Sequence, residues 1–482
     1  MPNNIFTPQW RPKVHFTPQK NWMNDPNGLV FYNGQYHLFY QYNPHGNDWG
    51  NMNWGHASST DLINWQHHPI AIEMDVAGLG YIYSGSAVVD FNNTSGLQQG
   101  EDPPLVAIFT HTQAGCETQR QSLAFSTDGG LSWQQYKNNP VIDNPGLLDF
   151  RDPKVFWHTP SQHWILVLTA GHQINFYRSE NLFNWQYISS FGEDDGCHGG
   201  EWECPDLFEL RTKDGEKKWV LLVSLVPGGP NGGNGTQYFV GDFDGQTFAP
   251  EHKDVRWLDY GPDNYAGVTW DGKQKLDNRR TLVAWMSNWI YAADMPTFPW
   301  RGAMCLPRDL SLIKHNQSFF VSNQPAKEID DNLITFAKHS QTATDVNCEL
   351  PTDSALDIKV SAEVNQGDKL YIRFSNSDGE VVELKYLPDH QKVVVDRSRA
   401  GWQYKLWRTP RLEADTTTSE GLINCRLVLD ASSLEVFWQD GTTTMTICLL
   451  PTSAFNKIEL ASSQLGTKCL ELSRIRHQSA TD

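Results

Sequence analysis

The sequence predicts an all-β protein, with a five-bladed β-propeller followed by a C-terminal β-sandwich. Short runs of β-branched and aromatic residues alternate with clusters of Gly, Asn, Asp and Pro, whereas amphipathic helical patterns are scarce. A turn motif that ends in an aromatic residue, usually tryptophan, recurs in the first part of the chain. Sixteen of the nineteen tryptophans precede residue 310, so the composition changes there. A chain of 482 residues is also too long for one ordinary hydrophobic core, which favours two domains.

The recurring turn defines the repeat unit of the first domain. Residues 59–65 (STDLINW) resemble residues 179–185 (SENLFNW), and residues 126–133 (STDGGLSW) are a longer version. Residues 241–248 (GDFDGQTF) are a fourth, more degenerate version. Each turn follows a strand-like run, and repeats of this length with several strands each are typical of propeller blades.

A polar group of residues stands just before the first strand of each of the five predicted blades. Successive groups are separated by about 51 to 68 residues, so five units account for roughly the first 310 positions. The first strand of each blade lines the central channel of a propeller, and we therefore expect all five groups to meet at one mouth of that channel. The groups are Asn24-Asp25, Tyr83-Ser84, Arg151-Asp152, Glu203-Cys204 and Asp263-Asn264-Tyr265.

The predicted domain limits follow from these changes in pattern. Residues 1–320 form the propeller, residues 321–338 a linker with a short helix that has Pro325 in its first turn, and residues 339–482 the sandwich. The last segment alternates apolar and polar residues, with hairpin turns at Asp378-Gly379 and Asp440-Gly441.

The formal net charge of −18 argues against two classes of partner. An acidic surface repels nucleic-acid phosphates and anionic membranes, so we expect neither as a partner, and a neutral substrate fits better. Residues 1–4 do not begin a secretory leader, and no apolar stretch is long enough to span a bilayer. We therefore expect a cytoplasmic protein, or a secreted one if a leader has been removed.

Neither the cysteines nor the histidines have the spacing of a metal site. No two of the eight cysteines form a CxxC pair, and the histidines lack an HExxH pattern. We expect free thiols, no metal and no cofactor. The cysteines are Cys116, Cys197, Cys204, Cys305, Cys348, Cys425, Cys448 and Cys469.

Three carboxylates, Asp25, Asp152 and Glu203, suit the cleavage of a glycosidic bond. Retaining glycosidases use two carboxyl groups about 5–5.5 Å apart, one as nucleophile and one as acid/base. Each of the three could instead be an ordinary turn or loop acid, since Asp-Pro and Asn-Gly are turn-forming pairs. Their matching place at the start of three blades favours the catalytic interpretation. Asn24 and nearby backbone N–H groups should keep Asp25 ionised, as a nucleophile requires.

The neighbours of the other two carboxylates predict different protonation states. Trp202 and Cys204 flank Glu203 with poorly hydrating surface, which favours the protonated acid. Arg151 should keep Asp152 ionised, so that it can bind sugar hydroxyls and oppose positive charge on the sugar ring.

Aromatic residues and amides near the predicted mouth suit sugar binding. Trp49 and Trp54 lie in a loop rich in Gly and Asn, and Trp285 and Trp289 lie in a similar polar segment. A single tryptophan is more often a core residue than a binding platform. Clustering of several in polar loops makes the two interpretations about equal.

These motifs make the chain resemble glycoside hydrolase family 32, which contains invertases, exo-inulinases and levanases. The resemblance covers nearly the whole chain and rests on Asn24-Asp25-Pro26-Asn27-Gly28, Arg151-Asp152-Pro153 and Glu203-Cys204-Pro205. It implies the same propeller and sandwich, a retaining mechanism and no metal. By this resemblance Asp25 is the nucleophile, Glu203 the acid/base and Asp152 the transition-state stabiliser. Substrate binding is then expected of Asn24, Gln41, Trp49, Trp54, Tyr83, Ser84, Arg151, Tyr265 and Trp285.

The resemblance implies an exo-acting β-fructofuranosidase that hydrolyses terminal non-reducing β-D-fructofuranosyl residues of sucrose and fructo-oligosaccharides, with inulin or levan as further substrates. Residues 150–156, 198–203 and 299–302 are most similar to the levanase and exo-inulinase branch. A cytoplasmic enzyme would meet only short, imported sugars. Three alternatives remain open: a fructosyltransferase on the same scaffold, a related five-bladed arabinosidase and a non-catalytic sugar-binding propeller. The sequence does not predict an oligomeric state.

Overall fold

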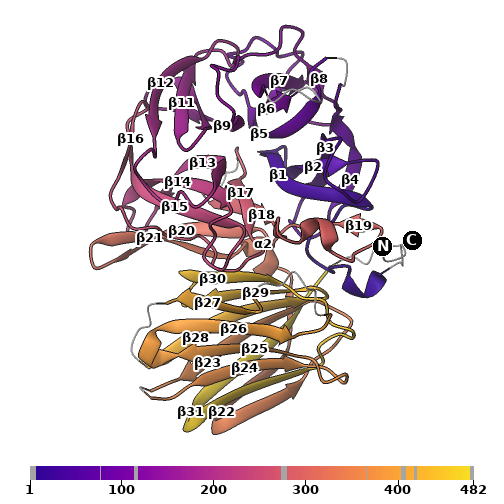
Figure 1. The fold of residues 1–482 in the computed structure, drawn as a ribbon, viewed down its shortest axis with the longest axis vertical. Coiled ribbons are helices and arrows are strands. Elements are labelled where there is room, and N and C mark those ends of the chain that lie inside the picture. Colours follow the sequence, from indigo (N-terminus) through magenta and orange to yellow (C-terminus); the bar gives the residue numbers. More distant parts are fainter. Residues whose placement is uncertain are drawn as a thin grey trace.

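The computed structural model describes residues 7–75, 78–112, 118–272, 279–365, 367–402, 409–416 and 421–477 (Figure 1). The leader prediction, which concerns residues 1–4, and the free thiol predicted at Cys116 lie outside these ranges. The seven cysteines within the ranges are all free thiols. No helix among these residues has both the length and the apolar character that crossing a membrane requires.

The first part of the chain forms five antiparallel sheets, here called blades 1 to 5, around one axis. The first strand of each blade lies nearest the centre, and Figure 1 shows these five strands converging there. The strands are β1 (Asn21–Tyr32), β2 (Gln35–Asn43), β3 (Asn53–Ser59) and β4 (Gln66–Ile72) in blade 1; β5 (Tyr81–Val89), β6 (Leu105–Thr112), β7 (Arg120–Ser126) and β8 (Gln134–Gln135) in blade 2; β9 (Phe150–His158), β10 (His163–Ala170), β11 (Ile174–Ser179) and β12 (Gln186–Phe191) in blade 3; β13 (Glu201–Arg211), β14 (Lys217–Val226), β15 (Gly235–Phe243) and β16 (Phe248–Pro250) in blade 4; and β17 (Tyr265–Thr269), β18 (Arg280–Trp285), β20 (Arg308–His315) and β21 (Ser318–Pro325) in blade 5.

A short strand, β19 (Trp300–Arg301), joins the last blade to the first. It belongs to the segment between β18 and β20 of blade 5, yet it pairs in parallel with the start of β1 in blade 1. The backbone N–H of Asn21 also donates to the carbonyl of Pro299 at 2.7 Å. The ring of blades is therefore closed only a few residues from Asp25.

The recurring turns connect the third and fourth strands of four blades. In blade 1 the side chains of Ser59 and Asp61 accept hydrogen bonds from the N–H groups of their own turn. In blade 3 Ser179 and Asn181 do the same. A turn whose side chains accept its own backbone N–H groups depends little on its surroundings, which explains why it recurs from blade to blade.

The second part of the chain is a β-sandwich, and the predicted fold class is confirmed. A short helix, α2 (Lys327–Asp330), precedes it, and the predicted domain limits at residues 320 and 338 remain a prediction. The described residues also contain three 3-10 helices: η1 (Pro8–Trp10), η2 (Ala292–Asp294) and η3 (Pro388–His390). The sandwich strands are β22 (Leu333–Glu349), β23 (Leu356–Glu363), β24 (Leu370–Ser375), β25 (Val381–Leu387), β26 (Lys392–Arg399), β27 (Arg411–Asp415), β28 (Leu422–Asp430), β29 (Ser433–Trp438), β30 (Thr443–Cys448) and β31 (Lys457–Ile475).

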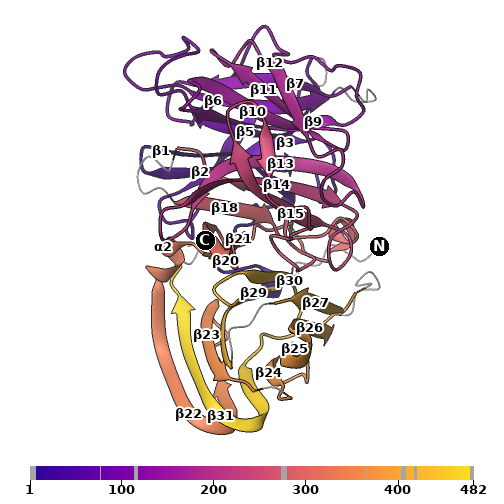
Figure 2. The ribbon, with the colours of Figure 1, turned by 90° about the vertical axis from the view of Figure 1, so that its left-hand side faces the viewer.

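Two long strands, β22 and β31, connect the two layers of the sandwich. The first part of β31, residues 457–462, pairs with β24, whereas residues 468–474 pair with β23 in the other layer. Figure 2 shows both strands curving around the end of the domain farthest from the propeller. One continuous sheet therefore folds over on itself and encloses a single apolar core.

Buried charges hold the sandwich against the propeller. The two ring nitrogens of His15 each lie 2.8 Å from a sandwich carboxylate, one on Asp430 and one on Glu435. Burial opposes a charge on His15, but hydrogen bonds to both carboxylates outweigh it and raise its pKa to about 9. Arg308 pairs with Asp259 at 2.8 Å and also with Glu435. Separating the two domains would break the pairs that His15 and Arg308 make with the sandwich carboxylates, so the domains are expected to behave as one unit.

Blade 1 also contains a stack of buried histidines. His37 Nδ1 lies 3.1 Å from His56 Nε2, and the His56 ring stacks between Phe39 at 4.3 Å and His68 at 4.5 Å. Burial, reinforced by the neighbouring histidines, lowers the pKa of His56 to about 2 and that of His37 to about 4. Both rings therefore stay neutral in the folded protein over the range in which unfolded histidine takes up a proton.

This stack predicts a loss of stability in acid. Below pH 6.5 the unfolded chain binds protons that folded His56 and His37 do not, so the contribution of each ring to the free energy of unfolding should fall by about 1.4 kcal/mol per pH unit. The contribution of His37 should keep falling until the pH reaches its pKa of about 4, and that of His56 should keep falling below pH 4. Chemical unfolding of the wild type and of a His56 variant at pH 7, 6 and 5 separates this contribution from that of Asp25 and Asp152, whose raised pKa values act in the opposite direction. The variant His56→Phe keeps the stacking and removes one of the two groups, so its stability should fall less steeply. Equal slopes would contradict the prediction.

Candidate active site

Every inner strand departs from regular pairing near its first residues. A bulge of this kind bends the strand and re-aims the side chains beside it. The irregular pairing therefore occurs at the same level in all five blades and points a ring of side chains into one mouth of the channel. The register shifts lie between Met23 and Pro26 in β1, between Ile82 and Gly85 in β5, opposite Val167 and Thr169 for β9, between Glu203 and Asp206 in β13, and between Tyr265 and Val268 in β17.

Three of these irregular sites contain a residue with left-handed backbone geometry. Asp152, Cys204 and Ala266 have φ angles of 63°, 47° and 53° in blades 3, 4 and 5. This region is sparsely populated by residues other than glycine, and residues held in it cluster at functional sites. The sequence also marks equivalent positions in three blades, because Asp25, Asp152 and Cys204 each precede a proline.

The innermost ring of side chains brings together Asp25, Ser84, Asp152 and Cys204. Ser84 Oγ donates a hydrogen bond to Asp25 Oδ2 at 2.8 Å. The thiol of Cys204 lies between the two aspartates, with Sγ 3.7 Å from Asp25 Oδ2 and 3.5 Å from Asp152 Oδ2. The backbone N–H of Cys204 donates to the same Asp152 oxygen at 3.0 Å. Burial raises the pKa of the Cys204 thiol, so it stays a neutral donor between two acids.

Glu203 belongs to a second ring, one residue away from the aspartates along the strands. Its carboxylate lies 3.1 Å from a guanidinium nitrogen of Arg151 and accepts a hydrogen bond from the hydroxyl of Tyr265. Arg151 also contacts Asp149, and Glu201 lies 3.2 Å from it. The sequence had suggested that Glu203 is the direct equivalent of the two aspartates, but Cys204 occupies that position and Glu203 precedes it. The three carboxylates still meet at one mouth.

The buried aspartates have shifted pKa values with separate causes. Burial and, to a smaller extent, the charge of Glu203 raise the pKa of Asp25 to about 6, although the hydrogen bond from Ser84 lowers it. Burial also raises the pKa of Asp152, to about 7. The nearest nitrogen of Arg151 is 3.9 Å from Asp152, so this cation only partly offsets the cost of burial. The expected ion pair between Arg151 and Asp152 is therefore present, but it does not keep the pKa of Asp152 low.

The surroundings of Glu203 also differ from the prediction. Trp202 and Cys204 were expected to flank it with apolar surface, but successive side chains of a strand point to opposite faces. Trp202 is fully buried in the core between blades 3 and 4, and the Cys204 thiol faces the aspartates. Glu203 lies instead between the guanidinium of Arg151 and the hydroxyl of Tyr265.

Two predicted binding residues are amides with fixed orientations. Asn24 Oδ1 accepts a hydrogen bond from the indole of Trp22 at 2.8 Å, which leaves the NH₂ group of Asn24 as its donor. Gln41 Nε2 donates to Asn27 Oδ1 at 2.7 Å, which leaves the Gln41 carbonyl oxygen as its acceptor. Both side chains are almost fully buried, so their polar ends are set before any ligand arrives.

The predicted aromatic platforms divide into surface and core residues. Trp49 is 46% exposed, and its ring lies 6.1 Å from that of Tyr83, so these two form one wall of the mouth. Trp54 differs from the prediction, because it is fully buried against Phe39 and Phe109. Its indole N–H donates to the carbonyl of Tyr83 at 3.0 Å, so it supports that wall from behind.

Trp285 is likewise a core residue rather than an exposed platform. It is fully buried against Trp22 and Trp289, with ring centroids 6.0 Å and 4.9 Å away. Trp289 is only partly buried and stacks on Trp22 at 5.8 Å. Of these three tryptophans it is the one that reaches the surface.

Sequence reasoning also missed one direct neighbour of the carboxylates, the thiol of Cys204. The signal was available in the Cys-Pro pair that parallels Asp25-Pro26 and Asp152-Pro153. Thr110 of β6 was missed as well, since its hydroxyl accepts the backbone N–H of Asp152 at 2.9 Å. Nothing in the local sequence marks Thr110, because it comes from a neighbouring blade.

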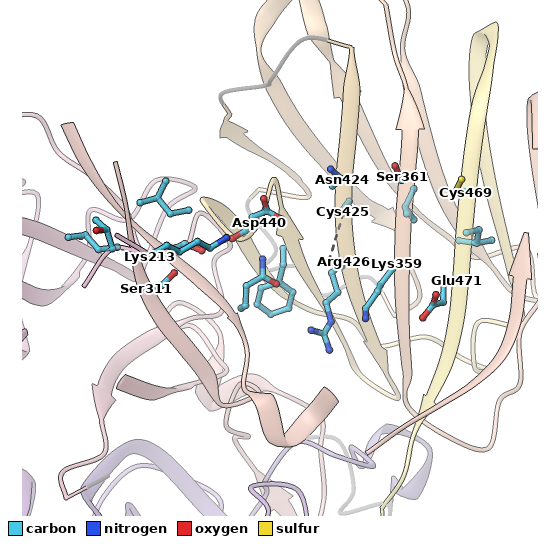
Figure 3. A pocket seen from close by; sticks show the side chains of 18 of the residues that line it. Lys213, Ser311, Lys359, Ser361, Asn424, Cys425, Arg426, Asp440, Cys469 and Glu471 are labelled. Atoms are coloured by element: carbon cyan, nitrogen blue, oxygen red, sulfur yellow. Dashed lines mark hydrogen bonds between the residues drawn. The ribbon is translucent and has the colours of Figure 1, made fainter. Parts of the chain in front are cut away.

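Two further observations concern the rest of the described structure. Within the described ranges, no three His, Cys, Asp or Glu side chains are grouped so that they could hold a metal ion. A groove of about 1190 Å³ lies elsewhere, between the propeller and the sandwich (Figure 3). Lysine, arginine and small polar side chains, such as Lys213, Ser311, Lys359 and Arg426, line it, and none of the three carboxylates does.

Comparison with known proteins gives matches over nearly the whole chain. The Glycosyl hydrolases family 32 N-terminal domain matches residues 15–323, and the family 32 C-terminal domain matches residues 323–476. A levanase of Bacillus subtilis is 44% identical over 489 residues, which cover 98% of this chain and 71% of the relative. The crystal structure of an exo-inulinase from Aspergillus awamori superimposes with a TM-score of 0.89 at 36% identity, covering 97% of this chain and 98% of the other. A fructofuranosidase from Schwanniomyces occidentalis, complexed with fructosylnystose, gives a TM-score of 0.89 at 30% identity, with 98% and 99% covered.

The hydrogen bond from Ser84 predicts a shift in pH dependence. Ser84 lowers the pKa of Asp25, so Ser84→Ala should raise that pKa above its present value of about 6. A hydrogen bond to a charged group contributes about 1.5 kcal/mol, which corresponds to roughly one pH unit. The acidic limb of the pH profile of kcat/KM should move up by that amount.

Ser86→Ala is the matched control for this variant. Ser86 lies on the same strand and is equally buried, but its hydroxyl donates to the carbonyl of Pro153 instead of to a carboxylate. Its acidic limb should not move. If Ser84→Ala leaves the limb in place, Asp25 is not the group that this limb reports.

Proposed function

The chain belongs to glycosyl hydrolase family 32, and from that premise we propose that it is a retaining, exo-acting β-fructofuranosidase. Its substrates are sucrose and fructo-oligosaccharides with a terminal non-reducing β-D-fructofuranosyl residue. Levan and inulin join them as candidate substrates, because relatives named levanase and exo-inulinase match almost the whole chain. The cytoplasmic location expected from the sequence stays a prediction, and so does the preference for short sugars.

The observation that best supports this proposal is the state of the two oxygens of Asp25. Oδ2 is held by Ser84 and faces the thiol of Cys204. Oδ1 is buried and has no hydrogen-bond partner among the described residues. A carboxylate oxygen that is fixed in place but not hydrogen-bonded is a competent nucleophile, and we assign it the attack on the anomeric carbon of fructose.

Glu203 is assigned the proton transfers. Its side chain is 22% exposed, whereas that of Asp152 is 6% exposed. Access to water is needed in the second step, when the acid/base must activate a water molecule against the fructosyl-enzyme. In the first step the same carboxyl group protonates the departing oxygen. Arg151 and Tyr265 fix the position of the carboxyl group from two sides.

Asp152 is assigned the role of stabilising the transition state. Its left-handed backbone aims the carboxylate into the mouth, and the N–H and thiol of Cys204 hold one oxygen. Positive charge develops on the sugar ring as the glycosidic bond breaks, and a fixed carboxylate beside the ring stabilises that charge. Asn24 and Gln41 present a donor and an acceptor suited to sugar hydroxyls, and Trp49 with Tyr83 supplies an aromatic wall.

A product assay with a nucleophile variant tests this proposal. Wild-type protein should release fructose as the first product from sucrose, kestose and inulin, because an exo-acting enzyme removes one terminal residue at a time. Asp25→Asn keeps the shape but removes the attacking charge, so kcat should fall by several orders of magnitude. Its thermal midpoint at pH 7 should not fall, because burial disfavours the charged carboxylate that the variant removes. Near-normal kcat in Asp25→Asn, or internal oligosaccharides as early products from inulin, would contradict the proposal.

A second variant separates the two steps. Glu203→Ala should lose far more activity on sucrose, whose glucose must be protonated to leave, than on nitrophenyl β-fructoside, which needs no proton. Removal of the base from the second step should then give a burst of nitrophenol. Azide needs no base, so it should restore turnover and form β-fructosyl azide. Equal losses on both substrates without azide rescue would assign the acid/base role to another residue.

A further inference from the structure

The segment that connects blade 4 to the first strand of blade 5 is bound by the sandwich. The backbone N–H of Tyr260 donates to the carbonyl of Thr444 at 2.8 Å, and that of Asp263 donates to the carbonyl of Thr446 at 3.3 Å. Both acceptors are on β30, at the edge of the sandwich sheet. Residues 259–263 therefore lie against the sandwich like one additional strand, and β17 begins two residues later.

Asp263 is the residue at which this attachment is strongest. It is fully buried, and its Oδ2 accepts the backbone N–H of Cys448 at 2.8 Å. Arg397, a buried residue of the sandwich, places a guanidinium nitrogen 3.2 Å from the same oxygen. The hydroxyl of Tyr291, from the propeller segment that follows Trp289, donates to the other oxygen. Burial raises the pKa of Asp263, and Arg397 opposes this shift.

Asp263 is connected to the catalytic centre by a very short path. Two residues further along the chain, Tyr265 begins β17 and donates its hydroxyl to Glu203. Asn264 between them is fully buried, and its amide lies 3.4 Å from Cys305 Sγ. A shift of the Asp263 backbone would therefore displace the ring of Tyr265.

We propose that Arg397 of the sandwich is a positioning residue for the acid/base of the propeller. It holds Asp263 in place, Asp263 fixes the start of β17, and Tyr265 thereby keeps Glu203 aligned with the departing oxygen. This inference rests on the proposed function. It gives the sandwich a role in catalysis, because one of the contacts that orient Glu203 depends on a side chain of the second domain.

Arg426, a partly buried arginine of the sandwich, does not have such a path. Arg426 pairs with Asp357 at 2.6 Å and with Asp330 of α2 at 2.8 Å. These partners lie on β23 and on the connection between the domains, away from residues 259–265. Like Arg397, Arg426 is a sandwich arginine that pairs with carboxylates. It therefore serves as the control for effects of such a substitution on stability alone.

The test compares sucrose with nitrophenyl β-fructoside in the full-length protein. Arg397→Lys keeps the charge but cannot reproduce the planar guanidinium contact, so the ring of Tyr265 should lose its fixed position. kcat/KM on sucrose should fall about 10-fold more than on the activated substrate, because only sucrose depends on an aligned acid. The loss should lie in kcat, with KM nearly unchanged. Arg426→Lys should leave the ratio between the two substrates unchanged, even if it lowers the thermal midpoint.

A double-mutant cycle identifies the route of the effect. Tyr265→Phe removes the hydroxyl that contacts Glu203 and should lower the same ratio. If Arg397 acts through this hydroxyl, Arg397→Lys should change the ratio less than about 2-fold in the Tyr265→Phe background. Independent effects that multiply would overturn the proposal, and so would equal losses on both substrates.

A third variant covers the case in which Arg397→Lys does not fold. Tyr291→Phe removes the hydroxyl that donates to Asp263 and accepts a hydrogen bond from Arg397 at 3.5 Å, but it keeps the ion pair between Arg397 and Asp263. It should lower the ratio in the same direction. An unchanged ratio in a folded Tyr291→Phe would overturn the proposal. Wild-type protein that hydrolyses neither substrate would overturn the proposed function, whereas an active wild type with an unchanged ratio in the Arg397 or Tyr291 variants overturns only the positioning role.

Discussion

The contacts of the Arg151 guanidinium are the interaction on which the rest of the site depends. Its nitrogens contact Glu203, Asp149 and Glu201, and one lies 3.9 Å from Asp152. Several carboxylates confined to one partly dry mouth would otherwise repel one another and become protonated. The arrangement of two rings follows from this constraint. The two aspartates share one neutral donor, the Cys204 thiol, and Asp25 also accepts a hydrogen bond from the Ser84 hydroxyl, while Glu203 contacts the Arg151 cation. Two carboxyl groups in different surroundings are what a reaction with a nucleophile and an acid requires.

The fold could be predicted from the sequence because its signals are local. The turn at residues 59–65 and its relatives satisfy their own backbone, so the same short pattern appears wherever the third strand of a blade gives way to the fourth. The polar pairs at the blade starts could be found for the same reason. Once a propeller is inferred, Asp25, Asp152 and Glu203 must converge, whatever their separation along the chain.

What could not be predicted depends on contacts between blades. Neighbouring residues of a strand point to opposite faces, and a bulge changes which of them faces the axis. The sequence alone therefore could not tell that Cys204 joins the aspartates, or that Trp54 and Trp285 are core residues while Trp289 is not. The ionisation of Asp152 was misjudged for a similar reason, because adjacency to Arg151 in sequence does not measure the distance between charged atoms or the cost of burial.

The short strand β19 has a consequence for the synthesis of the chain. Asp25 leaves the ribosome early, with the first strand of the first blade, but the strand that pairs with the start of β1 is made only after most of the propeller. Until residues 300 and 301 have emerged, the start of β1 is paired with β2 on one side only, and its other edge is open beside the future nucleophile. Open strand edges pair readily with those of other chains. This architecture therefore favours aggregation during translation. The risk ends when the segment between β18 and β20 has been made, because that segment supplies the strand that covers the open edge of β1.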